Sequence, residues 1–312
     1  MNKYVSYIIK RILALIPVLI GVTFIVFMIM SYSPGDPAKM LLGAGATPES
    51  IAELREKMGL NDPVLVQYGR YLFNLVRGDM GISYVSGNTV AHEIFSRFPN
   101  TVALAFGAVI FATVISIPIG IISATRQYSL IDNTGMIVAL LGVSMPSFWL
   151  GLMLMLLFSV RLGWLPSGGL NAGFRSLILP SITLGAESMA TITRTTRSSM
   201  LEVIRQDYIR TARAKGVPKR KVIAKHALRN ALIPTVTVTG IEMGALLGGA
   251  ILTETVFSWP GVGRLLIDAI SNKNTPVVLG CLVVFSLCFG IVNLVVDILY
   301  AFIDPRIMAQ YK

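Results

Sequence analysis

A cluster of basic residues between two apolar segments is the first feature of this sequence that could bind a partner. The stretch 201–234 holds nine of the chain's 27 Lys and Arg residues against Glu202 and Asp207. Gly216 can take the left-handed conformation that ends a helix, and Pro218 suits the first turn of the next one. Apolar side chains before the glycine recur every four residues and share one helical face: Met200, Ile204, Tyr208 and Ala212.

A second apolar face follows the proline, beneath further basic residues: Val222, Ile223, His226 and Ala227. The pattern therefore predicts a compact basic hairpin of two helices. The alternative is a positively charged loop that only fixes membrane topology, but such a loop needs no apolar stripe, glycine stop or proline restart.

Residue types that serve catalysis and metal binding are scarce. His92 and His226 are the only histidines, so the chain lacks the material for a zinc pair or a histidine-based triad. The motifs GxxxxGK[ST] and GxSxG do not occur. We therefore expect no catalytic residue, no metal site and no cofactor bound by this chain.

Composition places the chain among polytopic membrane proteins, because 54% of its residues are hydrophobic and its mean hydropathy is +0.70. The net charge of +11 lies in loops and lacks the aromatic residues that accompany nucleic-acid binding. Cys281 and Cys288 share one apolar segment, which excludes a disulfide framework and makes them packing residues.

The apolar segments predict six transmembrane helices in an all-α integral membrane fold. They are expected at 12–35, between 97 and 126, between 132 and 161, at 176–200, at 231–256 and at 275–302. Residues 1–32 then form a tail and the first helix, 33–99 a helical extracytoplasmic cap, and 100–312 the transmembrane core with the hairpin 201–234. Within the cap, Thr47 with Pro48 and Asp62 with Pro63 predict two helix starts. A short helix is also expected within 257–273.

The distribution of Lys and Arg predicts the orientation. Both termini, the 125–134 loop and residues 194–229 together carry 17 of the 27 basic residues. Because basic residues concentrate on the cytoplasmic side, we expect the termini and the hairpin inside and the cap outside.

Two acidic residues fall within predicted membrane helices, Glu187 and Glu242. A charged side chain at mid-bilayer costs about 2.5–3.5 kcal/mol on insertion scales, so both should face protein or water. Each is either part of a translocation path or polar subunit contact, or a packing carboxylate with a local partner. Gly240, Gly244 and Gly248 share one face and predict close helix packing.

Six runs of sequence resemble the permease subunit of a bacterial binding-protein-dependent ABC importer, and within that group the oligopeptide and dipeptide permease B type. They are YIIKRILALIPVLIGVTFIVF with SPGDPA, GLNDPVLVQYGRYL, RGDMGIS, DYIRTARAKG, HALRNALIP and FSWPGVGRLL, and they cover nearly the whole chain. The resemblance implies a type I ABC importer permease fold.

The run DYIRTARAKG resembles the coupling motif of these importers, whose general form is EAA followed by glycine. It implies that the coupling residues are Asp207, Arg210, Thr211, Ala212, Arg213, Ala214, Lys215 and Gly216. Arg210 stands where the motif has glutamate, and Asp207 or Glu202 is the available replacement.

The resemblance also implies partners: a homologous second permease, two cytoplasmic ATP-binding subunits that hold ATP and Mg, and an extracytoplasmic solute-binding protein. The implied cargo is di- or oligopeptides crossing the bacterial inner membrane, with glutathione, nickel chelates or another small solute as alternatives. A secondary transporter and a non-transporting scaffold share the topology, but the sequence lacks the inverted repeat and ion cluster of the former.

Overall fold

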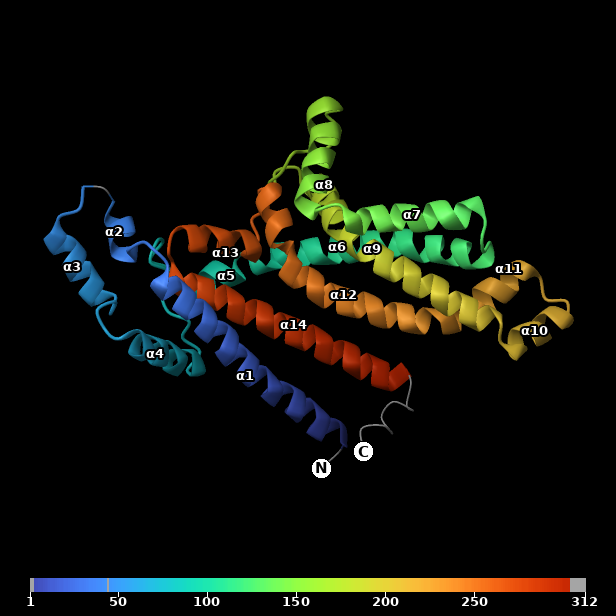
Figure 1. The fold of residues 1–312 in the computed structure, drawn as a ribbon, viewed down its shortest axis with the longest axis horizontal. Coiled ribbons are helices and arrows are strands. Elements are labelled where there is room, and N and C mark those ends of the chain that lie inside the picture. The colour runs from blue at the N-terminus through green and yellow to red at the C-terminus, as the bar shows by residue number, and fades with distance from the viewer. Residues whose placement is uncertain (1–2, 44, 304–312) are drawn as a thin grey trace. The chain divides into compact units, whose positions relative to one another are not determined.

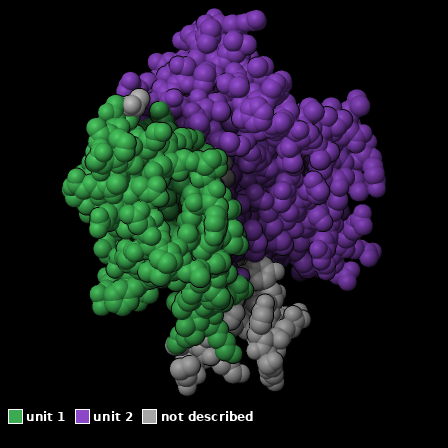
Figure 2. All heavy atoms as spheres, turned by 60° about the vertical axis from the view of Figure 1, so that its left-hand side comes forward, with its two compact units in different colours: residues 1–101, 260–290 green, residues 102–259, 291–312 purple. Residues whose placement is uncertain are grey.

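The structure, a computed structural model, describes residues 3–43 and 45–303, including the side chains except those of 3–7, 249 and 299–303. The described chain is helical apart from one β-bridge between Ile82 and Thr89, which confirms the predicted all-helical class. It forms two compact units, residues 1–101 with 260–290 and residues 102–259 with 291–312 (Figure 2). The extreme tails, which the sequence assigns to the cytoplasm, lie outside the described residues.

The first unit begins with α1 (Lys3–Tyr32), followed by four shorter helices: α2 (Pro37–Leu42), α3 (Pro48–Lys57), α4 (Val64–Val76) and α5 (Val90–Phe95) (Figure 1). Thr47 starts α3 as predicted, because its Oγ1 accepts a hydrogen bond from the Ser50 N–H at 3.3 Å. Asp36 starts α2 in the same way, accepting from the Ala38 N–H at 3.0 Å. Side-chain oxygens thus satisfy backbone donors that the helix itself leaves unpaired.

Helix α4 packs against α1 through a buried tyrosine. The Tyr68 hydroxyl donates to the Ile20 carbonyl at 2.9 Å and lies 3.0 Å from Thr23 Oγ1. Its ring packs edge-on against Phe24 with centroids 5.2 Å apart. The start of α4 differs from the prediction: Asp62 does not cap the helix but pairs with Arg70 at 2.5 Å. An arginine two turns along offers that carboxylate a charged donor, and charged donors bind more strongly than a backbone N–H.

The expected short helix in 257–273 is α13 (Val262–Ser271), and it leads into α14 (Thr275–Ile303). Asn274, between them, is buried and accepts from the Tyr84 N–H at 3.1 Å while its amide donates to Ser83 Oγ at 2.8 Å. Burial raises the pKa of the Tyr84 phenol. The loop before α5 is therefore fastened to the turn before α14.

The second unit is built around α9 (Phe174–Ile204), which packs against α7 (Leu130–Ser144), α8 (Ser147–Leu154) and α12 (Leu228–Val256). Small residues let α6 (Phe98–Thr125) approach α9 as well. A Cβ on Gly185 would meet the Ala108 carbonyl oxygen at 2.6 Å, and Ser116 Oγ donates to the Met189 carbonyl at 3.1 Å. Of the 31 residues in α9, 16 are buried, so this helix is the core of the unit.

The prediction of one helix between 132 and 161 is wrong. The segment is broken between α7 and α8 with a bend of 104°, and its last turns form the π-helix η1 (Met155–Arg161). Pro146 has no N–H to donate, and it holds Met145 in an extended conformation, with φ −89° and ψ 132°. The sequence carried this local signal in Pro146.

Within the described residues, four helical segments are long and apolar enough to cross a membrane: Ile8–Tyr32, Val90–Thr125, Lys219–Gly248 and Thr275–Ile298. The bent pair Leu130–Ser144 and Ser147–Arg161 adds a fifth if it is one span. Helix α9 occupies the position of the predicted fourth crossing but is not among these segments. It carries Glu187, Arg194 and Arg197 among many hydroxyl side chains, so its place in a membrane depends on its neighbours.

Candidate functional site

The basic hairpin, residues 201–234, contains α10 (Asp207–Ala214), α11 (Lys219–Lys221) and the π-helix η2 (Val222–Ala227), which runs into α12. It lies beyond the ends of α9 and α12 (Figure 1). An apolar cluster holds it together. The buried members are Ala124, Met200, Ile209, Ala212, Val222, Ala227 and Ala231. The hairpin is thus a packed element rather than a loose charged loop.

The predicted apolar face of the helix before Gly216 needs one correction. α9 ends at Ile204 and α10 starts at Asp207, so no single helix joins Met200 to Ala212. The break turns Tyr208 outward, where it is 43% exposed, and places Ile209 in the core instead. The Tyr208 hydroxyl accepts a hydrogen bond from Asn230 Nδ2 at 2.8 Å, which joins the two arms at the surface.

Gly216 ends α10 in the left-handed conformation that its residue type predicts, with φ +74°. Its N–H donates to the Arg213 carbonyl at 3.0 Å, and the Val217 N–H donates to the Ala212 carbonyl at 3.2 Å. These two bonds define a Schellman motif. Val217 then packs against the apolar cluster, so the turn at Gly216 sets the angle between the arms.

The predicted coupling residues share one helix and its turn, but they divide by exposure. Ala212 is buried with Ile209 against the cluster. The other seven are exposed: Asp207, Arg210, Thr211, Arg213, Ala214, Lys215 and Gly216. The carboxylate of Asp207 lies 4.0 Å from Arg210, with both side chains open to solvent. Helix α10 therefore presents a cationic, hydrogen-bonding outer face on an apolar base.

An open pocket of about 450 Å³ lies beside the turn of the hairpin. Its walls come from the end of α6, the end of α9 and the turn itself: Ala124, Thr125, Ile204, Arg213, Val217, Lys219 and Ile223. The charged groups in this lining are both cations.

An ion pair that sequence reasoning missed joins α9 to α7. Arg197 Nε and its terminal Nη2 each donate to the carboxylate of Asp132 at 2.8 Å. The Tyr128 N–H donates to the same carboxylate at 3.0 Å. The Asp132 side chain is 3% exposed and that of Arg197 24%. The sequence shows Asp132 in a short polar loop with one basic residue, Arg126, but the partner of Asp132 lies 65 residues away along the chain.

The structure separates the two acids expected inside the membrane. Glu242 on α12 is partly buried and accepts a hydrogen bond from Ser188 Oγ of α9 at 2.6 Å, so it joins these two helices. Glu187, which directly precedes Ser188 in α9, is exposed. Whether either lines a path stays a prediction.

The three glycines of α12 have different surroundings. A Cβ on Gly240 would lie 2.5 Å from Val296 Cγ2 of α14, whereas a Cβ on Gly248 would meet nothing within 4 Å. Gly244 is buried. Gly240 therefore lies at a close helix contact within this chain, and the shared packing role of the three stays a prediction.

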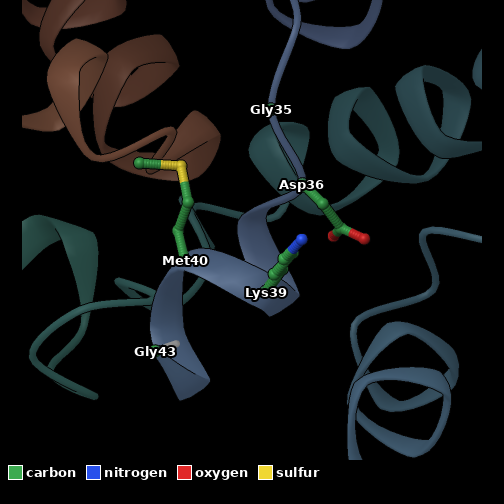
Figure 3. A pocket seen from close by; sticks show the side chains of 5 residues that line it. All are labelled: Gly35, Asp36, Lys39, Met40 and Gly43. Atoms are coloured by element: carbon green, nitrogen blue, oxygen red, sulfur yellow. The ribbon is translucent and has the colours of Figure 1, made fainter. Parts of the chain in front are cut away.

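Among residues 3–43 and 45–303, the structure contains no group of three or more His, Cys, Asp or Glu side chains that could hold a metal ion. A second pocket, about 330 Å³, lies in the first unit at the SPGDPA run and is lined by Gly35, Asp36, Lys39, Met40 and Gly43 (Figure 3). The Asp36 carboxylate there is occupied by the α2 cap and by Arg55 at 3.1 Å. This pocket offers no catalytic arrangement.

Comparison with known proteins assigns both parts of the chain. Residues 116–309 match the family described as "Binding-protein-dependent transport system inner membrane component", and residues 4–105 match the N-terminal region described for such membrane components.

Three relatives match along nearly their whole length. The dipeptide transport system permease protein DppB of Alkalihalophilus pseudofirmus is 46% identical over 97% of this chain and 99% of its own. The glutathione transport system permease protein GsiC of Salmonella paratyphi A is 46% identical over 98% and 99%. The oligopeptide transport system permease protein AppB of Bacillus subtilis is 44% identical over 97% and 99%. A chain of the inward-facing MetNI methionine ABC transporter gives a TM-score of 0.49 at 23% identity, covering 64% of this chain and 92% of its own.

Proposed function

We propose that this chain, which belongs to the family of binding-protein-dependent transport system inner membrane components, is the membrane permease subunit of an ABC importer that carries peptides. The observation that carries the proposal is the near-complete match to dipeptide and oligopeptide permeases at 44–46% identity. The absence of a nucleotide-binding motif supports a translocation subunit rather than a catalytic one.

Glutathione is the second candidate cargo, because the glutathione permease is 46% identical over 98% of this chain. Glutathione is itself a tripeptide, with one ammonium group and two carboxylates, so both candidates are small peptides that carry charges of both signs. The proposal is therefore an importer of short zwitterionic peptides in the bacterial inner membrane.

Transport by such a permease requires partners. We assign the binding of ATP and Mg to two cytoplasmic ATP-binding subunits. A homologous second permease forms the other half of the transport path, and an extracytoplasmic binding protein delivers the cargo. The basic hairpin is the coupling element, since a packed helix with a fixed turn transmits force and a loose loop does not. The helical cap, residues 33–99, is the surface that meets the binding protein.

This assignment implies six crossings, with α9 as the polar one and the bent pair α7 and α8 as another. Both termini and the hairpin then lie in the cytoplasm, in agreement with the Lys and Arg distribution. Helix α9 can cross although it is polar, because half of it is covered by its own chain and water or protein can cover the rest.

Uptake measurements test the function directly. Cells that contain the partner subunits should lose uptake of a labelled dipeptide, a labelled tetrapeptide or labelled glutathione when this chain is deleted, and the substrate that is lost identifies the cargo. Two different ATP-binding polypeptides should purify with the chain. Unchanged uptake of all three substrates would contradict the peptide assignment, and purification without an ATP-binding polypeptide would contradict the importer.

A further inference from the structure

The exposed face of α9 is polar along its inner half. From Glu187 to the end of the helix, the exposed residues follow one another at helical spacing: Glu187, Thr191, Arg194, Ser198 and Glu202. None of them is apolar, whereas the opposite face is buried against the rest of the second unit. We call the first four of these residues the polar stripe.

In the six-crossing arrangement proposed above, the position of the polar stripe along α9 places it within the membrane. At a rise of 1.5 Å per residue, Glu187 lies about 20 Å from the outer end of α9 at Phe174, and Arg194 about 30 Å. The hydrocarbon core is about 30 Å thick and α9 is about 46 Å long, so the midpoint of the helix falls near Glu187. Lipid cannot cover this face, because each charge at that depth costs about 2.5–3.5 kcal/mol.

The two charges of the stripe have opposite signs but do not neutralise each other. Seven residues of helix separate Glu187 from Arg194 by about 10 Å, which is beyond the length of an ion pair. Both positions face the same way because seven residues are close to two turns. The hydroxyl of Thr191 lies between them on the same face.

A short peptide has the complementary pattern. Its ammonium and carboxylate groups stand about 10 Å apart in an extended tripeptide, and its amide groups between them seek hydrogen bonds. We propose that the polar stripe of α9 lines the transport path and that Glu187 and Arg194 guide the two charged ends of a zwitterionic peptide in transit. This inference rests on the proposed function and adds to it the residues that contact cargo.

The same geometry distinguishes Glu187 from Glu242. Glu242 accepts the hydrogen bond of Ser188 between α9 and α12, so its removal alters packing and should slow every cargo by the same factor. Glu187 is exposed on the polar stripe, so its removal should act on the charge of the cargo. Glu242→Gln is thus the matched structural control for Glu187→Gln.

The first test measures water access in the assembled transporter. Cys281 and Cys288 are replaced by alanine, and single cysteines are placed at Glu187, Thr191 or Arg194, with the buried Thr193 as the control. A hydrophilic maleimide should label the stripe positions at least ten times faster than position 193, and saturating peptide with its binding protein should slow that labelling. Slow labelling in the complex but fast labelling in the isolated chain would overturn the proposal, because the second permease would then cover the stripe.

The second test measures charge recognition by uptake of a free tripeptide into liposomes. Glu187→Arg and Arg194→Glu should each slow uptake about tenfold while ATP hydrolysis stimulated by the binding protein persists. The double variant restores one charge of each sign, so it should recover most of the uptake through a cargo held in the reverse direction. A double variant that is as slow as the product of the two single effects would overturn the proposal. Absence of peptide uptake by the unmodified complex would instead contradict the proposed function.

Discussion

The turn at Gly216 gives the sharpest test of how the basic hairpin works. Its φ of +74° is readily adopted by glycine, whereas an ordinary L-residue pays about 1–2 kcal/mol to adopt the left-handed conformation. A Cβ at this position would meet nothing within 4 Å, so the penalty comes from the backbone alone. Gly216→Leu should therefore shift the balance between closed and opened turns about 5–30-fold toward opening.

Opening of the turn breaks the two Schellman bonds, from Gly216 to Arg213 and from Val217 to Ala212, and releases Val217 from the cluster. Since these contacts fix the angle of α10, the hairpin of Gly216→Leu should transmit less of a push from an ATP-binding subunit. We expect assembly to remain intact while peptide uptake falls severalfold for each ATP hydrolysed. The assay compares uptake and hydrolysis in the same liposomes, and co-purification of the partner subunits measures assembly.

Gly216→Asn is the matched control, because asparagine enters the left-handed region far more readily than leucine. It should keep most of the coupling. Unchanged uptake by Gly216→Leu would refute the reasoning, and an equal loss in both variants would show that the backbone conformation is not the cause.

Two further predictions concern packing in the second unit. Asp132→Asn should lower the stability of the purified chain by about 3 kcal/mol, because it leaves the Arg197 guanidinium partly buried without its charged partner. A lower midpoint of thermal unfolding would show the loss of stability. The double variant Asp132→Arg with Arg197→Asp should recover part of it. An unchanged midpoint in Asp132→Asn would contradict the prediction. Gly240→Ala should destabilise the chain by about 1–3 kcal/mol, because the new Cβ meets Val296, and Val296→Ala should relieve that effect. Gly248→Ala, which has open space, should not lower the midpoint, and equal losses at both glycines would argue against the contact with Val296.

Local signals in the sequence predicted local structure well. Thr47 and Gly216 act through their own backbone and the next few residues, so their residue types were enough to place the start of α3 and the end of α10. Pro146 is a local signal of the same kind. The break that it causes was missed because the uncharged run from 133 to 160 was read by length alone.

Contacts between segments far apart in the sequence could not be predicted from local residue types. The pairing of Asp132 with Arg197 and the bond from Ser188 to Glu242 join residues 65 and 54 positions apart. Sequence patterning identified Glu187 and Glu242 as a pair of unusual acids, but their different surroundings depend on which face of α9 or α12 each occupies. Likewise, the break at Arg205 and Gln206 decides that Ile209 is buried and Tyr208 exposed, which is the reverse of the predicted face.

Helix α9 links the two parts of the proposed mechanism. It runs unbroken from Glu187 to Ile204, about 25 Å, and its last proline, Pro180, lies before this stretch. The burial of Met200 in the apolar cluster joins the end of α9 to the hairpin, and Arg197, three residues earlier, holds α9 to Asp132 of α7.

The segment that follows the turn, η2 with α12, is built differently. η2 is π-helical, and α12 contains Pro234 six residues after its start. Both features weaken the regular pattern of helical hydrogen bonds. A displacement of α10 should therefore move α9 and its polar stripe as a rigid body. The angle between α10 and α12 should change by bending within η2 and the first turns of α12. Since α9 carries Glu187 and Arg194, the proposed coupling movement of the hairpin and the proposed cargo path are joined in a single helix.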